Sequence, residues 1–453
     1  MSDPADLSLA AAAEAIARKE LSPLELLDAC MERVERLEPA LRAFVTLDEA
    51  GARARAAELT GAEPLGPLQG VPVAIKDLID VAGLPTTASS KVLAGNIATR
   101  DAPVVESLRR AGALVLGKTN TQEFAYGVVS PPTRNPWDLE RISGGSSGGS
   151  AVAIAAGLSP GALGTDTSGS VRIPSSLCGI MGLIPRRGAV KMERIVPLSW
   201  SLDVLGPMAS DAASVESMWR ALTGAASVSG GLKGLRLATL NWDSTGADVE
   251  VLEVVEEAVE VLAPRATRTE VAVPEFTAWD RPQGVFLACE ALTIHRQAGW
   301  YPQRSDDYTE ETRNSLRHAE RFTAVDFVTA RRKLERLRAV WLEALEDCDL
   351  LALPTTPIAA PRVDELAALK AKELRPEIVM RLTRLCKWIN FCGLAAVSVP
   401  CGFTAEGLPV GLQLVARDEA TVLGAALAYQ ELTDWHTRRP LETAERGPLH
   451  SGP

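Results

Sequence analysis

The strongest constraint on the fold is an alternation of helix-type and strand-type patterns along the 453 residues. Leu, Ala and Ile recur at helical spacing over 7–18 and 22–37, whereas 71–75 is a short β-branched run typical of a buried strand. A helical pattern over 104–111 is followed by another strand pattern over 113–116. Such alternation is typical of α/β proteins. We therefore predict a large mixed, mostly parallel twisted sheet covered by helices on both faces.

The same patterns continue to the C-terminal part of the chain. Further strands are predicted at 235–240, 350–353, 396–399 and 410–415, and further helices at 249–262 and about 323–346. No internal repeat, low-complexity tract or linker interrupts them. We expect residues 1–453 to form one domain, in which a less regular region at about 265–390 covers the pocket.

Charge and cysteine usage exclude several classes of protein. The formal net charge is −11, and a nucleic-acid or anionic-membrane surface would need clustered Lys and Arg. The seven cysteines are odd in number and widely spaced, which is typical of free thiols in a reducing compartment. The first residues lack the basic region of a signal peptide, and no apolar run is long enough to span a bilayer. We expect a cytoplasmic protein.

Several common catalytic patterns are missing from this sequence. There are four histidines, and none lies near the Gly/Ser-rich segment from Arg134 to Gly188. A Ser-His-Asp triad is therefore disfavoured, although a histidine could still approach in space. No metal-binding motif, phosphate-binding loop or G-x-S-x-G turn is present.

One lysine stands where a charge is costly. Lys76 ends the predicted buried strand in the segment Gly70–Asp77. A buried lysine is unfavourable unless it is neutral or paired. Taken alone, the segment favours a lysine that points to solvent beyond the end of the strand.

Two small-residue segments could build a reaction site. Gly144–Ser150 precedes an apolar helical pattern at 151–157, and its glycines let backbones approach closely. In Gly164–Pro174, the small residues before Ser170 can aim consecutive N–H groups at one point, as an oxyanion hole requires. Each segment alone could also be an ordinary turn or loop.

Taken together, the three segments resemble the amidase signature family. The resemblance covers nearly the whole chain, and the block from Gly144 to Pro174 is its most specific part. Shorter matches support it at Gly117–Asn120, Glu123–Gly127, Asn135–Asp138, Pro354–Pro357, Cys401–Phe403 and Gly407–Gln413. The resemblance implies the amidase signature fold.

The resemblance also implies a Ser–cis-Ser–Lys triad made of Lys76, Ser146 and Ser170. The peptide bond entering Ser146 would be cis. Neutral Lys76 would accept a proton through Ser146, so that Ser170 could attack a carbonyl and form an acyl-enzyme. No cofactor is implied.

Further site residues follow from the same resemblance. The oxyanion hole is expected at the backbone N–H groups of Thr167, Ser168 and Gly169. Ser168 stands where glycine is usual in the family, which could re-aim this loop. Supporting hydrogen bonds are expected from Ser147, Thr165, Asp166 and Arg172. Substrate contacts are expected from Tyr126, Gly127, Val128 and Trp200.

The function expected from these observations is an amidase that hydrolyses C–N bonds of carboxamides. Aromatic residues near the motifs favour aryl or hydrophobic small-molecule amides, although they could equally be core residues. A carbamate or urea-type hydrolase with the same triad is an alternative, and a glutamine amidotransferase subunit is a further one. A non-catalytic scaffold would be expected to lack a triad member. The expected partner is the small-molecule substrate, with neither nucleic acid nor membrane, and a homodimer is allowed for.

Overall fold

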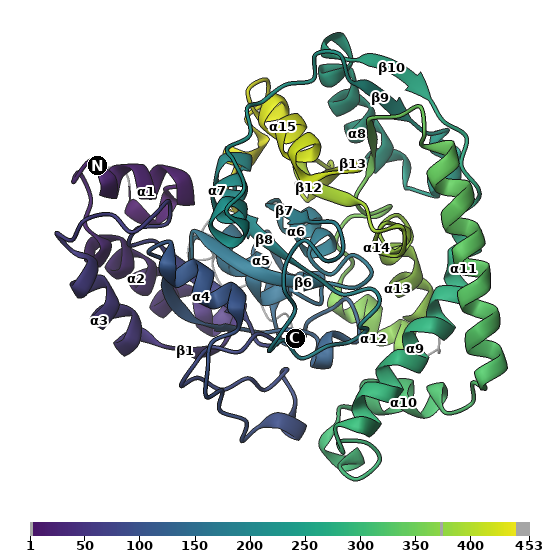
Figure 1. Ribbon diagram of the computed structural model, residues 1–453, viewed down its shortest axis with the longest axis horizontal. Coiled ribbons are helices and arrows are strands. Elements are labelled where there is room, and N and C mark those ends of the chain that lie inside the picture. Colours follow the sequence, from purple (N-terminus) through teal and green to yellow (C-terminus); the bar gives the residue numbers. More distant parts are fainter. Residues whose placement is uncertain (1–2, 372–374, 441–453) are drawn as a thin grey trace, which may run out of the picture.

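The computed structural model describes residues 3–371 and 375–440 and is built around an eleven-stranded sheet (Figure 1). Its strand order is β1-β3-β2-β6-β8-β7-β12-β13-β11-β9-β10. The bounds are β1 Phe44–Leu47, β2 Pro72–Lys76, β3 Leu114–Thr119, β6 Gly161–Asp166, β7 Met181–Ile184, β8 Val204–Ala209, β9 Arg236–Thr239, β10 Thr267–Glu270, β11 Leu350–Pro354, β12 Ala395–Phe403 and β13 Pro409–Ala416. A separate pair joins β4 Arg134–Asn135 to β5 Asp138–Ile142.

The sheet is mixed, as predicted, but it is not mostly parallel. β2 runs parallel to β3 and β6, and β9 runs parallel to β10 and β11. The other neighbouring pairs in the sheet are antiparallel. The sequence prediction was wrong here because it assumed that a helix carries the chain over between strands. Instead, the residues 404–408 turn β12 directly back into β13, which requires an antiparallel pair.

Helices cover both faces of the sheet, which confirms that part of the fold prediction. Their bounds are α1 Leu9–Ala17, α2 Pro23–Leu41, α3 Glu49–Leu59, α4 Pro103–Arg110, α5 Gly148–Ala155, α6 Arg172–Cys178, α7 Ala212–Thr223, α8 Val249–Leu262, α9 Asp280–Gln297, α10 Glu310–Ala319, α11 Ala324–Ala344, α12 Val363–Ala371, α13 Arg375–Thr383, α14 Lys387–Cys392 and α15 Glu419–Gln430.

Strand alternation decides which helices pack on which face. On β13, Leu412 and Leu414 belong to a core shared with α7, α8 and α15. Gln413, between them, points to the opposite face and contacts Arg172 of α6. Because successive side chains of a strand point to opposite faces, one strand serves both layers. The face that carries α5 and α6 is the one on which the small-residue segments lie.

The helices α9, α10, α11 and α14 form what we call the helical wall, along one side of the molecule (Figure 1). Its aromatic residues pack together: the rings of Trp341 and Trp388 lie 4.2 Å apart, and Trp279 meets Trp341 edge-on. The region 265–390, expected to be less regular, is largely helical. The assignment of 1–453 to a single domain stays a prediction.

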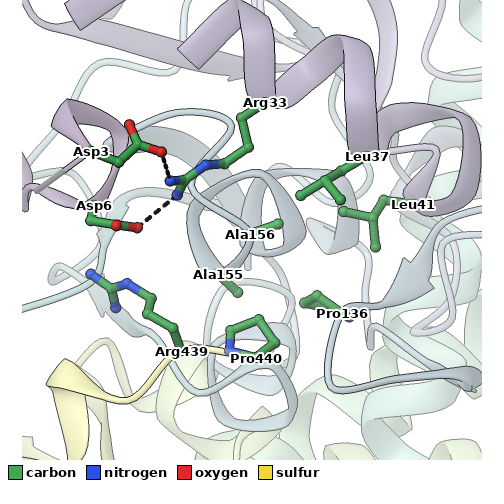
Figure 2. Close-up of a pocket in the computed structure, with 10 residues that line it drawn as sticks. All are labelled: Asp3, Asp6, Arg33, Leu37, Leu41, Pro136, Ala155, Ala156, Arg439 and Pro440. Carbon is green, nitrogen blue, oxygen red and sulfur yellow. Dashed lines mark hydrogen bonds and ion pairs between the residues drawn. The ribbon is translucent and has the colours of Figure 1, made fainter. Parts of the chain in front are cut away.

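The two ends of the described chain meet at a cavity of about 350 Å³. Figure 2 shows Arg33 of α2 reaching towards both Asp3 and Asp6, with Arg439 and Pro440 lining the same cavity. Arg33 is nearly buried, so these two ion pairs hold the N-terminal residues against α2.

The sequence predictions about cysteines and about membrane-spanning segments can be compared with the structure. All seven cysteines are free thiols, and six of them are buried, as expected. Within residues 3–371 and 375–440, no helix has the length and apolar character needed to cross a membrane.

Candidate active site

Lys76 is the centre of the candidate site. It is the last residue of β2, it is fully buried, and its neighbours β3 and β6 end at the same edge of the sheet. Lys76 Nζ lies 2.7 Å from Ser146 Oγ, 2.9 Å from Ser147 Oγ and 2.9 Å from Thr165 Oγ1. Lys76 of the segment Gly70–Asp77 therefore contacts both small-residue segments, Gly144–Ser150 and Gly164–Pro174. A lysine that points to solvent is excluded.

Burial sets the proton affinity of Lys76. Removal from water lowers its pKa to about 7, although the negative charges of Asp166 and Asp203 oppose the shift. A second buried lysine, Lys118 on β3, lies 3.1 Å from the carboxylate of Asp77. Lys76 has no carboxylate within ion-pair distance among the described residues. The two lysines differ in their partners, and only Lys76 is surrounded by hydroxyl groups.

The turn that carries Ser146 is held from behind its carbonyl group. The peptide bond between Gly145 and Ser146 is cis, as the resemblance implies. The Ser146 carbonyl accepts hydrogen bonds from Thr121 Oγ1 at 2.8 Å and from Ser130 Oγ at 2.9 Å. A Cβ atom on Gly145 would lie 2.8 Å from the Val128 carbonyl carbon. The glycine therefore permits a close approach of two backbone segments.

Ser170 lies beside this turn. Its carbonyl oxygen accepts a hydrogen bond of 3.1 Å from the backbone N–H of Ser147, so residues 146–147 and 170 are neighbours in space. The Ser170 side chain is buried, and its hydroxyl makes no hydrogen bond with the residues that the structure describes. An uncommitted hydroxyl at this point is available to a substrate.

A buried ion pair fixes the loop that ends in Ser170. Asp166 and Arg172 are fully buried and lie 3.0 Å apart. Burial alone would raise the pKa of Asp166, but Arg172 and nearby N–H donors hold it below its usual value. Arg172 also donates to Gln413 Oε1 and Asn390 Oδ1. Its full burial and its pair with Asp166 give Arg172 a structural place in this loop.

The loop geometry departs from one expectation about the oxyanion hole. The N–H of Gly169 donates to Asp166 Oδ1 at 2.7 Å, so this predicted donor is already engaged. The N–H groups of Thr167, Ser168 and Ser170 make no hydrogen bond within the described part of the chain. The φ of 121° at Gly169 is a backbone conformation that favours glycine at this position of the loop. Ser170 is a donor that sequence reasoning missed.

Asp203, at the start of the strand β8, supports the same loop. It accepts hydrogen bonds from Thr167 Oγ1 at 2.6 Å, from Leu198 N at 2.8 Å and from Ser199 N at 2.9 Å. Burial raises the pKa of Asp203 to about 6. Sequence reasoning missed this residue. The available signal was a lone acid before the apolar run 204–209.

The four predicted substrate contacts lie in different surroundings. Val128 is buried and packs with Ile173 and Leu177 beside the nucleophile loop. Gly127 and Tyr126 are half-buried next to it, whereas Trp200 has 54% of its surface exposed. Their contact with a substrate stays a prediction. Three other aromatic residues considered for the pocket are core residues instead: Phe124, Trp388 and Phe391.

Other polar residues of the site were not foreseen as partners. They are Thr121, Ser130, Gln283, Asn390 and Gln413. Their partners lie far away in sequence, so long-range packing reveals their role. In the described residues, no group of three or more His, Cys, Asp or Glu side chains is arranged to hold a metal ion.

Comparisons with known proteins identify the family to which the chain is similar. The family model Amidase matches residues 25–423. A glutamyl-tRNA(Gln) amidotransferase subunit from Roseiflexus castenholzii (strain DSM 13941 / HLO8) is 36% identical over 97% of this chain and 98% of its own length. An amidase from Pseudomonas putida is 38% identical over 97% of this chain and 99% of its own. The structure of 6-aminohexanoate cyclic dimer hydrolase complexed with substrate has a TM-score of 0.85 at 28% identity and covers 96% of this chain and 99% of its own.

Proposed function

Because the chain belongs to the amidase family of hydrolases that act on C–N bonds, we propose that it hydrolyses carboxamides through Ser170, Ser146 and Lys76. One observation carries this proposal. Lys76 Nζ is fully buried without a carboxylate partner among the described residues, and it lies 2.7 Å from Ser146 Oγ. A lysine in such surroundings has the lowered pKa that a general base needs near neutral pH.

The hydroxyl groups around Lys76 suit a neutral amine. A neutral amine has two N–H donors and one lone pair. Ser147 Oγ donates to the Thr165 carbonyl, so its oxygen is free to accept one N–H from Lys76, and Thr165 Oγ1 can accept the other. The lone pair then faces the Ser146 hydroxyl, which can pass a proton to it.

The reaction follows from this relay. Ser170 Oγ attacks the carbonyl carbon while its proton moves to Ser146, whose own proton moves to Lys76. The backbone N–H groups of Thr167 and Ser168 stabilise the negative charge that forms on the carbonyl oxygen. The C–N bond breaks as Ser146 returns a proton to the leaving nitrogen. Water then hydrolyses the Ser170 ester by the same relay.

The surroundings of the nucleophile favour an apolar acyl group. Val128, Ile173 and Leu177 form an apolar cluster next to the loop that carries Ser170. This supports aryl or hydrophobic small-molecule amides as substrates. Carbamates are an alternative, because the same relay can cleave their C–N bond.

A hydrolysis screen tests the proposal. Matched anilides, aliphatic amides, nitrophenyl carbamates and free glutamine are assayed with the native protein and with Ser170→Ala as the blank. Turnover of anilides that is lost in the blank supports the amidase. Turnover of carbamates alone supports the alternative. Anilide hydrolysis that persists in Ser170→Ala contradicts the assigned nucleophile.

The second candidate function is that of a glutamine amidotransferase subunit. The similarity to the glutamyl-tRNA(Gln) amidotransferase subunit from Roseiflexus castenholzii, over nearly the full length of both chains, favours it. In that case free glutamine is the substrate that is turned over in the screen. Anilide turnover with no release of ammonia from glutamine excludes it.

A further inference from the structure

A recess of about 330 Å³ opens between the helical wall and the loop after β7. Phe286 of α9, Phe327 of α11 and Phe391 of α14 line it. Arg331 and Arg338 of α11 and Arg187 of the loop line it as well. We call it the arginine recess. Figure 1 shows α9 and α11 running side by side there.

The three guanidinium groups of the recess lack carboxylate partners within the described chain. Arg331 makes no ion pair or hydrogen bond there, and the buried Nε of Arg338 has no partner. Arg187 donates only to the Ser201 carbonyl. By contrast, the adjacent Arg186 pairs with Glu419 at 3.2 Å. Like charges gathered without counter-charges, in a chain with a net charge of −11, indicate an anion-binding site.

The two acidic residues of the recess cancel only part of this charge. The Glu290 carboxylate is engaged by Ser199 Oγ and by Ser201, whose Oγ lies 2.6 Å away and whose N–H lies 3.2 Å away. Glu335 is exposed and forms no ion pair within the described residues. Three arginines against two glutamates leave one net positive charge, which suits a single carboxylate.

The floor of the recess is formed by three phenylalanines, of which only Phe327 is partly exposed. The rings of Phe286 and Phe327 stack with centroids 5.1 Å apart and planes 11° apart. Phe391 meets Phe286 edge-on at 5.8 Å. A ligand that fits both floor and rim therefore carries its carboxylate on an aliphatic or aromatic body.

Two paths of neighbouring residues connect the recess to the catalytic loop, and the second is made of hydrogen bonds. Gln283 of α9 donates to Ser168 Oγ at 3.3 Å, and Phe286 and Glu290 follow it at spacings of three and seven along the same helix face. Along the second path, Glu290 binds Ser199, whose N–H donates to Asp203, the partner of Thr167. The recess is therefore next to the site, although none of its lining residues belongs to the triad.

We propose that the arginine recess binds a carboxylate that the amide substrate carries at the end remote from the scissile bond. The inference rests on the proposed amidase function and deepens it, since it makes the substrate an anionic amide with an apolar spacer. Phe327, the partly exposed ring, contacts the spacer, and Arg331 and Arg338 contact the carboxylate.

The kinetic test uses nitroanilides of linear dicarboxylic acids with one free carboxylate, paired with nitroanilides of fatty acids of equal length. We expect kcat/KM to be roughly tenfold higher for the acid at the best length, because a charge-assisted contact is worth about that factor. Arg331→Gln and Arg338→Gln raise KM for the acid and leave the neutral partner unchanged. Glu335→Gln lowers KM for the acid. Equal kinetics for both substrates at every length overturn the proposal.

Arg332→Gln is the matched control, because it removes the same charge from the same helix at a position that does not line the recess. An equal effect of Arg332→Gln and Arg331→Gln means a general field effect and overturns the proposal.

A binding measurement separates the recess from the proposed activity. Titration calorimetry with the acid nitroanilide and the Ser170→Ala protein is expected to show binding that Arg338→Gln weakens. If no amide is hydrolysed but this binding persists, the proposed function fails and the recess stands. If a free dicarboxylate inhibits non-competitively, the recess is a separate anion site and the substrate role is overturned.

Discussion

At the scale of single residues, the site depends on the proton state of Lys76. Lys118, one strand away, has Asp77 as a counter-charge, whereas Lys76 has hydroxyl and carbonyl oxygens. Desolvation lowers the pKa of both lysines, but at Lys118 the charge of Asp77 and its hydrogen bond oppose the shift directly. The two lysines are therefore suited to different tasks, Lys118 to structure and Lys76 to proton transfer.

The pH dependence of hydrolysis should report Lys76. Its pKa is lowered to about 7 by burial, and only its neutral form accepts a proton. We expect kcat/KM to rise with pH through about 7 and then level off. The Asp203 charge raises the pKa of Lys76, so Asp203→Asn should shift this rise to lower pH. A profile that is flat from about pH 5 to pH 9, measured with a neutral anilide, contradicts the role of Lys76.

Arg172 illustrates a residue whose effect is on stability. Replacing it with leucine leaves the Asp166 carboxylate buried without its counter-charge. Loss of one partner from a buried pair costs about 3–5 kcal/mol. We expect Arg172→Leu to lower the free energy of unfolding in urea by about that amount. Arg186→Leu is the control, because its pair with Glu419 has an exposed guanidinium and should matter by about 1 kcal/mol or less. Equal losses in both variants contradict the assignment.

At the scale of elements, the start of α5 is packed against backbone. A Cβ atom on Gly149 would lie 2.6 Å from both the N and the O of Asn120, and it would also meet the Ala43 carbonyl. Neither neighbour can rotate away, because both are main chain. This contact sets where the turn with Ser146 lies relative to β2 and β3.

Substitution of this glycine should therefore be costly. We expect Gly149→Ala to destabilise the protein by about 1–3 kcal/mol, as overpacking typically does, and to lower kcat because the Ser146 turn moves. Gly284→Ala in α9 is the matched control: a Cβ there meets nothing within 4 Å, and helix propensity predicts stabilisation by about 0.4–1 kcal/mol. Thermal melts and anilide kinetics of both variants measure these effects. Unchanged stability of Gly149→Ala contradicts the packing described.

At the scale of the whole molecule, one apolar core joins the sheet and the helical wall. It contains Ala151–Ala156 of α5 together with Trp341 and Trp388 of the wall. The sheet itself uses strands from β1 near the N-terminus to β13. That residues 1–453 form one domain stays a prediction.

Equilibrium unfolding tests that prediction. Tryptophan fluorescence includes a signal from the wall, where Trp279, Trp341 and Trp388, three of the nine tryptophans, are buried, and far-ultraviolet circular dichroism reports on all helices and strands. If 1–453 is one cooperative unit, both signals should change with the same midpoint in urea. Two separated midpoints would assign the wall to a unit of its own.

Local pattern by itself determined much of this protein. The helices at Pro23–Leu41 and Val249–Leu262 and the strands at Pro72–Lys76 and Pro409–Ala416 follow from spacing of apolar residues, because that spacing reflects which side of an element is buried. The small-residue segments around Ser146 and Ser170 were also recognisable in sequence. Their chemistry requires short side chains at adjacent positions.

Only the tertiary structure decided how these pieces meet. Whether two neighbouring strands run parallel or antiparallel depends on how the chain connects them. The apolar pattern of a single strand carries no information about that connection. The engagement of Gly169 by Asp166, the support of Thr167 by Asp203 and the arginine recess all depend on how distant or non-adjacent residues meet in space. Such side-chain partners are set by the packing of whole layers, so the sequence indicated the reacting groups and the fold supplied their environment.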